Sequence, residues 1–164
     1  MSAVSSGARA SPGNRATAVA RSVALAIVVV IIDQLTKQAV RSGIAVGDVH
    51  KLLPGVNLVH VTNNGVAFGF LAGGGAIVLV VTLVALSALT GFFIMHPTRS
   101  WLWLACGLLV GGALGNLIDR LAHGSVTDFI KLPLWPAFNL ADTAITIGVF
   151  ALLFVLESRH LDER

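Results

Sequence analysis

Charged residues are scarce in this chain of 164 residues: only 12% are charged, whereas 55% are hydrophobic. A soluble domain with this composition would have too little polar surface to cover itself. The net charge of +3 is small, and the basic residues form no patch interleaved with aromatic side chains, so no nucleic-acid partner is expected. The composition therefore indicates a membrane protein, and the length allows one domain.

Cysteine is almost absent as well. The one cysteine, Cys106, excludes an intrachain disulfide, and it lies inside an apolar segment, where such a residue usually packs as a small hydrophobic group. The sequence also has no H-E-x-x-H motif for zinc and no G-x-S-x-G nucleophile turn. We therefore expect no metal and no cofactor, and we expect neither zinc nor serine protease chemistry.

The sequence contains four long apolar segments. Each has about the 17–25 residues that an α-helix needs to cross hydrocarbon. They cover approximately residues 18–40, 76–95, 101–121 and 138–156. We predict an all-α integral membrane protein with four transmembrane helices, in a single domain over residues 18–157. A disordered tail over residues 1–17 and a short tail over 158–164 complete the predicted organisation.

The first apolar run, residues 23–32, could alternatively belong to a signal peptide, because arginines precede it. However, no small-x-small cleavage site follows, and the run leads directly into Asp33-Gln34-Leu35-Thr36-Lys37. We therefore interpret the run as the first half of a retained spanning helix. Counting Lys and Arg in the tails and loops favours cytoplasmic termini by a small margin.

Residues 43–75 have no helical pattern. Pro54-Gly55 predicts a turn, residues 56–62 a short strand, and Asn63-Asn64-Gly65 a hairpin turn with a return strand at 66–68. We predict a small extracytoplasmic β-structured lobe over 43–75, between the first and second helices, resting on the membrane surface. Asn63 could be a turn residue with positive φ or part of a site.

Polar side chains gather between residues 111 and 148, where one apolar segment ends and the next begins. They are Asn116, Asp119, Arg120, Asp128, Asn139 and Asp142. An ionisable group at hydrocarbon depth is costly, so each marks a candidate functional site. Asp128 lies in a connection that two prolines keep from being helical, and its chain stays at one membrane face. Asp128 and Asp142 can therefore form an acid–base pair.

Ordinary structural explanations remain open for several of these residues. Asn139 and Asp142, at i and i+3, suit the N-cap and first turn of a helix. Arg120 could be a snorkelling anchor at a helix end. Asp33 and Lys37, at i and i+4, share a helix face and could form a self-neutralising interfacial pair or help to shape a polar site.

Two other classes of function are also compatible with the sequence. In a small transporter, the acidic residues and Lys37 would form a proton or ion relay. In a structural assembly subunit, the stripe Gly107, Gly111 and Gly115 would pack against a partner helix. The clustering of polar groups at one face argues against the transporter, and a structural subunit would not need two acidic residues beside Asn116 and Asn139.

Five short motifs occur in order and in register with the predicted helices. They are Asp33-Gln34-x-Thr36-Lys37, Asn63-x-Gly65-x-Ala67-Phe68, Gly111-Gly112-Ala113-x-Gly115-Asn116-x-Ile118-Asp119-Arg120, Val126-x-Asp128-Phe129 and Phe138-Asn139-x-Ala141-Asp142. Together they resemble the lipoprotein signal peptidases (signal peptidase II), over about residues 20–157.

The resemblance implies a multi-pass aspartyl endopeptidase of the bacterial inner membrane, with both termini cytoplasmic and the active site at the extracytoplasmic face. It implies a lipid-modified prolipoprotein as substrate, cut just before the diacylglyceryl-bearing cysteine, in contact with membrane lipid; we expect a monomer. The implied catalytic residues are Asp128 and Asp142. Those implied to support the site or the substrate are Asp33, Lys37, Asn63, Gly65, Phe68, Asn116, Asp119, Arg120 and Asn139.

This chemistry agrees with what the residues offer. Two nearby carboxylates in a low-dielectric site cannot both stay charged, so the pKa of one rises. The ionised member can then take a proton from water while the protonated member polarises the scissile carbonyl. Asp142, in a first helical turn, is favoured in the ionised form, so Asp128 is the expected holder of the shared proton.

Overall fold

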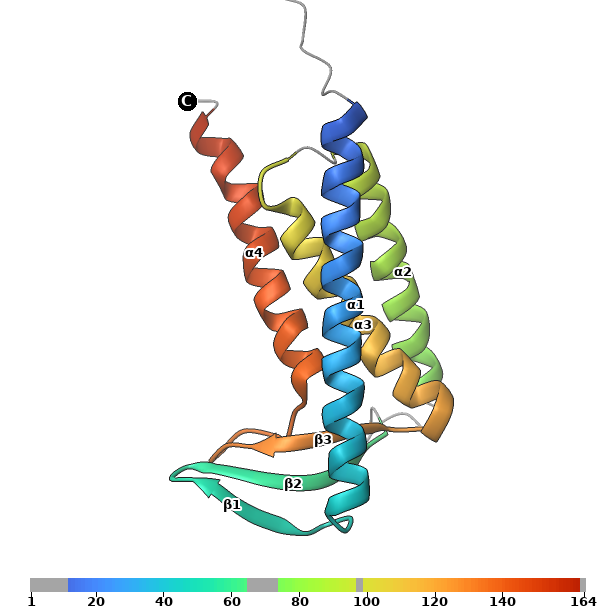
Figure 1. Ribbon diagram of the computed structural model, residues 1–164, viewed down its shortest axis with the longest axis vertical. Helices are drawn as coiled ribbons and strands as arrows, with labels where there is room; N and C mark the ends of the chain where they lie inside the picture. Colours follow the sequence, from blue (N-terminus) through green and yellow to red (C-terminus); the bar gives the residue numbers. More distant parts are fainter. Residues whose placement is uncertain (1–11, 65–73, 97–98, 163–164) are drawn as a thin grey trace, which may run out of the picture.

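The structure, a computed structural model, describes residues 12–64, 74–96 and 99–162. In these residues, helices that alternate in direction stand side by side, and a small sheet crosses one end of the bundle (Figure 1). The elements in order are α1 (Pro12–Gly43), β1 (Val49–Leu53), β2 (Val56–Asn63), α2 (Gly74–Met95), α3 (Leu102–His123), β3 (Val126–Lys131) and α4 (Leu140–Asp162). The start of α1 and the end of α4 lie at the end opposite the sheet.

Three of the described helices are long and apolar enough to cross a membrane: Gly13–Gly43, Leu102–His123 and Leu140–Ser158. The part of α2 whose side chains are described, Val80–Met95, is apolar but shorter. Many apolar side chains on these helices are exposed, as expected for surfaces that face lipid. A membrane protein is supported, while a fourth spanning helix at α2 stays a prediction.

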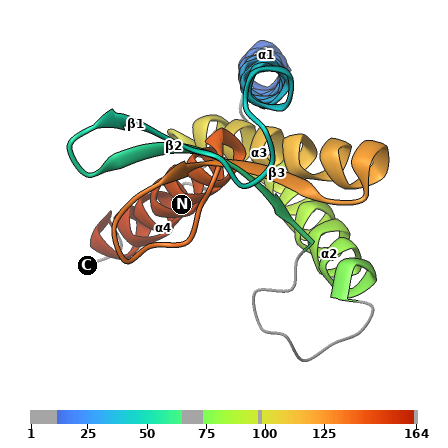
Figure 2. The same cartoon turned by 90° about the horizontal axis from the view of Figure 1, so that it is seen from below.

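Helix α3 is the centre of the bundle and packs against α1, α2 and α4 (Figure 2). Its glycine stripe is where α1 approaches. A Cβ on Gly107 would lie 2.9 Å from Ser22 O, and a Cβ on Gly111 would lie 2.8 Å from Val29 Cβ. Real side chains do not come this close, so the predicted small-residue stripe serves to pack α1 on α3 within the chain.

A cluster of buried hydrophobic residues closes the bundle at the end away from the sheet. It contains Phe93, Leu102, Cys106 and Val155. Cys106 is only 2% exposed, which agrees with its expected role as a small buried hydrophobic group.

The sheet is antiparallel, in the order β1-β2-β3. The predicted strand at 56–62 corresponds to β2, and the predicted Pro54-Gly55 turn joins it to β1, with Gly55 at φ +79°. The return strand expected at 66–68 lies outside the described residues. The other neighbour of β2 is β3, from between α3 and α4, so the lobe is not confined to residues 43–75 as predicted. Sequence patterns reveal strands but not which distant strand completes the pair.

Two predicted boundaries were wrong. Helix α1 begins at Pro12, inside the stretch 1–17 that was expected to be a disordered tail. Proline suits the first turn of a helix because its φ is preset and no N–H is needed there. Helix α4 continues to Asp162, so most of the expected tail over 158–164 is helical.

Candidate functional site

Strand β3 and the start of α4 bring Asp128 and Asp142 into one site at the sheet end of the bundle. Asp128 is 2% exposed. After β3 the chain turns back, and Phe138 exchanges backbone hydrogen bonds with Ile130, at 3.0 and 2.8 Å. This return sets Asn139 beside β3 just before α4 begins, so the two aspartates face a common residue.

Asn139 is that common residue, and it serves as the N-cap of α4. Its Oδ1 accepts the Asp142 N–H at 2.9 Å, and the Asp142 Oδ2 accepts the Asn139 N–H at 3.2 Å, a reciprocal capping arrangement. The same side chain donates through Nδ2 to Asp128 Oδ1 at 2.7 Å. The ordinary helix-start explanation is therefore correct as geometry, and the cap also connects the two carboxyl groups.

Two more asparagines hold the remaining carboxylate oxygens. Asn63 Nδ2 donates to Asp128 Oδ2 at 2.9 Å, across the β2–β3 pair in which Val61 lies opposite Asp128. Asn116 Nδ2 donates to Asp142 Oδ1 at 2.8 Å. Each oxygen of both aspartates thus accepts a hydrogen bond, which fixes the orientation of the carboxyl planes.

Lys37 connects the layer of asparagine side chains (Asn63, Asn116 and Asn139) to a buried charge cluster. Its Nζ donates to Asn116 Oδ1 at 2.9 Å and pairs with Asp33 at 2.8 Å and Asp119 at 3.4 Å. The Lys37, Asp33 and Asp119 side chains are 0% exposed. The alternative of an interfacial pair is therefore wrong: Asp33 and Lys37 point inward, where two carboxylates compensate for the desolvation of one ammonium group.

Asp33 also ties α1 to the first turn of α4. Its Oδ1 accepts the Ala141 N–H at 2.9 Å, one of the backbone donors that a helix start leaves without an intrahelical partner. Gly115 makes room for this carboxylate, because a Cβ there would lie 2.6 Å from Asp33 Oδ2. The third glycine of the stripe therefore has a direct part in forming the site.

Three polar residues of the cluster were missing from the sequence-based set. Gln34 Nε2 and Arg41 Nη1 each donate to Asp119 Oδ1 at 3.2 Å, and Arg41 Nη1 donates to Thr127 Oγ1 at 3.1 Å. Asp119 Oδ2 in turn accepts the Thr127 N–H at 2.9 Å. The residue next to Asp128 is thereby held by Asp119. Spacing could have found Arg41, since it continues the i, i+4 row of Asp33 and Lys37.

Arg120 lies beside the layer of asparagine side chains and not in its centre. Its Nη1 donates to Asn116 O at 3.3 Å, and the residue is half-buried. With Asn116 and Asp142 it lines a groove of about 470 Å³ between α2, α3 and α4, whose other lining residues are largely apolar. Of the predicted supporting residues, Gly65 and Phe68 lie outside the described part of the chain.

The two carboxyl groups differ in environment. Burial, together with the nearby charge of Asp142, raises the pKa of Asp128 to about 6, although hydrogen bonds from Asn63 and Asn139 favour its ionised form. Asp142 is half-buried, lies in a first helical turn and accepts two hydrogen bonds. Among the described residues, no group of three or more His, Cys, Asp or Glu is placed to hold a metal ion. The arrangement can hold one proton and one negative charge side by side.

Comparisons with known proteins agree on one family. A family model described as signal peptidase (SPase) II matches residues 25–157. The lipoprotein signal peptidase of Paraburkholderia phymatum is 44% identical over 138 residues, which cover 79% of this chain and 83% of that protein. The lipoprotein signal peptidase of Pelotomaculum thermopropionicum is 41% identical over 131 residues, covering 79% of this chain and 86% of that protein.

Solved structures agree with the fold. Two structures described as bacterial membrane enzymes match with TM-scores of 0.79 and 0.81, at 37% and 35% identity. The matches cover 84% and 89% of this chain and 93% of each of the other chains.

Proposed function

Because the chain belongs to the signal peptidase II family, we propose that it is an aspartyl endopeptidase, which removes signal peptides from diacylglyceryl-modified prolipoproteins in the bacterial inner membrane. The observation that carries the aspartyl mechanism is Asn139, whose side-chain Nδ2 donates to the Asp128 carboxylate and whose backbone N–H donates to the Asp142 carboxylate. A carboxyl group with a raised pKa beside one that caps a helix is the division of roles that acid–base hydrolysis requires.

The proposed reaction begins with Asp142 ionised and Asp128 protonated. Asp142 takes a proton from a water molecule as the water oxygen attacks the scissile carbonyl carbon. Asp128 donates its proton to the carbonyl oxygen, which gives a neutral tetrahedral diol. Asp142 then passes its proton to the leaving nitrogen of the lipidated cysteine, the C–N bond breaks, and a diol hydroxyl returns a proton to Asp128. Both carboxyl groups end as they began, and no cofactor is consumed.

The groove between α2, α3 and α4 is the proposed place for the substrate. It combines an apolar lining with Asp142 and Asn116, so an apolar signal segment could lie against the wall while its last peptide bond reaches the carboxylate. Arg120 lines the same groove, and its guanidinium offers donors for substrate carbonyl oxygens. We propose that cleavage takes place immediately before the lipidated cysteine, where an extended segment meets Asp128 and Asp142.

We further propose that all four helices span the membrane, with both termini cytoplasmic and the sheet at the extracytoplasmic surface. Exposed apolar side chains on and beside the sheet, Leu52, Leu53, Leu134 and Trp135, support contact with the membrane interface. Cysteines at Ser42 and Ser158, in a Cys106→Ala background, test this topology. An impermeant thiol reagent should label intact cells only at position 42; labelling at 158 instead would reverse it.

The arrangement gives less support to a transporter. The buried charged residues of the described chain, Asp33, Lys37, Asp119 and Asp128, form one cluster at the sheet end and do not extend along the bundle. A relay would need further polar groups across the membrane.

One experiment tests the proposed activity. The purified chain, reconstituted in liposomes, receives a precursor peptide with a diacylglyceryl cysteine, and the products are identified by mass spectrometry. We expect a cut on the N-terminal side of the modified cysteine, with an unmodified precursor as the control. An intact modified precursor, with a correctly folded protein, would refute the proposal.

A further inference from the structure

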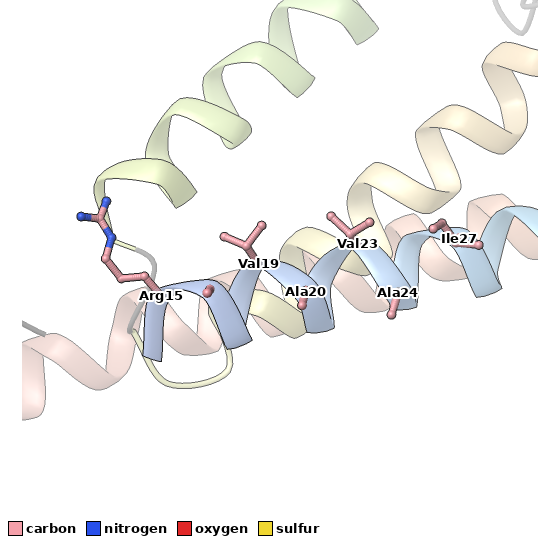
Figure 3. Close-up of a pocket in the computed structure, with 7 residues that line it drawn as sticks. Arg15, Val19, Ala20, Val23, Ala24 and Ile27 are labelled. Atoms are coloured by element: carbon pink, nitrogen blue, oxygen red, sulfur yellow. The ribbon is translucent and has the colours of Figure 1, made fainter. Parts of the chain in front are cut away.

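Figure 3 shows a row of side chains along the first half of α1, on the surface of the bundle. The row consists of Arg15, Val19, Val23 and Ile27, which repeat every four residues and so follow one face of the helix. Figure 3 shows the apolar members pointing to the side that the Arg15 guanidinium also takes, while Ala20 and Ala24 point away.

Two hollows share this row. One, of about 630 Å³, is a shallow and open strip lined by α1 alone, where the short side chains of Ala16, Ala20 and Ala24 leave room along the helix. The other, of about 590 Å³, lies between α1, α2 and α3. Val19, Val23 and Ile27 line both, and they are 42%, 52% and 53% exposed. An apolar ridge with an apolar hollow on either side therefore faces the surroundings of the bundle.

The second hollow exists because α1 and α2 do not pack on each other. Over the described residues, both helices approach α3, but no pair of Cα atoms joins α1 to α2 within 8 Å. On a helix that crosses a membrane, acyl chains fill such a gap, since water there would be costly. The walls supplied by α2, which include Leu89, Phe93 and Ile94, are apolar and match that filling.

Arg15 gives this surface a charge at one end. Its Nη2 donates to Ile94 O at 3.2 Å, so the guanidinium lies where the start of α1 meets the end of α2. A guanidinium carries five N–H donors, and this bond occupies one of them. The group is therefore able to bind a phosphate oxygen as well, the ligand that its planar fork matches best.

The dimensions suit a lipid in one leaflet. From Arg15 to Ile27 the helix rises about 18 Å at 1.5 Å per residue. Half of the hydrocarbon thickness of a bilayer is about 15 Å. The acyl chains of a lipid whose phosphate binds Arg15 would thus extend along the length of the row.

We propose that this surface binds one anionic diacyl phospholipid, with the phosphate on Arg15 and one acyl chain in each hollow. The lipid fills the gap between α1 and α2 and so holds α1 against the bundle. Apart from Leu89, which lines both, the site shares no lining residue with the substrate groove between α2, α3 and α4. The proposal does not depend on the peptidase activity.

The test uses the full chain in detergent and compares phosphatidylglycerol with phosphatidylcholine of identical acyl chains. Native mass spectrometry counts the bound lipids and gives their apparent affinities. We expect one phosphatidylglycerol to bind about fivefold more tightly than phosphatidylcholine, the effect of about 1 kcal/mol expected for one basic residue at a membrane surface. Arg15→Gln should remove this preference, and Arg15→Lys should retain most of it.

Two further variants make the result specific. Arg21 is the matched control: it lies near the same end of α1, but its guanidinium carbon is 5.9 Å from the Trp103 ring centroid and does not line either hollow. Arg21→Gln should keep the preference for phosphatidylglycerol. Ala20→Phe should weaken binding of both lipids because its ring would occupy the strip beside Val19 and Val23.

Three results would overturn the proposal. They are equal binding of the two lipids by the unaltered chain, an unchanged preference in Arg15→Gln, and a dimer of the chain without bound lipid.

Discussion

Replacing Asn139 tests the central feature of the proposed mechanism, because this side chain performs two tasks that substitution can separate. Its Oδ1 caps α4 through the Asp142 N–H, and its Nδ2 donates to Asp128 Oδ1. Serine is as good an N-cap as asparagine, but it is too short to reach Asp128 as well. Asn139→Ser should therefore keep the cap and lose the bridge, whereas Asn139→Ala loses both.

The expected magnitudes differ for stability and rate. Loss of the cap costs about 0.5–2 kcal/mol, and each variant also leaves buried Asn116 and Asp128 acceptors with one donor fewer, at about 1–3 kcal/mol. The free energy of unfolding of Asn139→Ala should thus lie below that of Asn139→Ser by about the contribution of the cap, and Asn139→Ala should melt at a lower temperature. The turnover rate of both variants should fall about 10²-fold, because displacing a reacting group by about 1 Å lowers the rate by about that factor.

The pH profile distinguishes positioning from general damage. A donor to a carboxylate favours the ionised form, so removal of Asn139 Nδ2 raises the pKa of Asp128 above its value of about 6. The mechanism needs Asp128 protonated, so the basic limb of kcat/KM, near pH 6 in the unaltered free enzyme, should move to higher pH in both variants. If Asn139→Ser cleaves within about threefold of the unaltered rate, or if its basic limb stays in place, the bridge does not organise the aspartates and the reasoning fails.

Further substitutions separate chemistry from stability. Asp128→Asn and Asp142→Asn should each lose about 10²–10⁴-fold in cleavage rate while keeping a thermal melt within a few degrees of the unaltered chain; activity above about a tenth in either would refute the aspartyl mechanism. Because the pKa of Asp128 is raised from 3.8 to about 6, the folded state binds more protons between these values, and the free energy of unfolding should fall as pH rises from about 4 to about 6. That decline should be absent in Asp128→Asn, and an unchanged pH dependence there would show that another group causes it. Lys37→Ala leaves buried carboxylates without their cation and should cost about 3–5 kcal/mol of stability. Arg120→Ala should instead lower cleavage with little change in melting temperature. If Arg120→Ala lowered the melting temperature and Lys37→Ala did not, the result would contradict the burial of Lys37 and the half-buried position of Arg120.

The membrane class and the approximate helices could be predicted because each depends on local composition. An apolar run of about 20 residues has few alternatives to a spanning helix, and proline and glycine mark where the runs end. Spacing also placed Asp33 with Lys37, and Asn139 with Asp142, because a helix puts residues three or four apart on one face. The glycine stripe indicated close helix packing for the same reason.

The contacts of these faces depended on the folded chain. Periodicity gives the direction of a side chain relative to its own helix, but it does not give the helix that lies opposite. Lys37 could therefore be read as interfacial, whereas α3 buries it between Asp33 and Asp119. Gln34 was missed because its partner, Asp119, lies on another helix.

The sequence by itself determined that the chain is a membrane protein, where its helices lie, and which two aspartates are the candidates, because apolar length and local spacing are properties of a single segment. Only the tertiary structure decided that β3 completes a sheet with β2, that Asn63 therefore reaches Asp128, and that the Asn116 side chain and the Asn139 backbone N–H hold the second carboxylate beside the first. The physical reason is that a hydrogen bond between segments depends on distances of about 3 Å, which are set by the packing of all four helices and the sheet and are not encoded in any one of them.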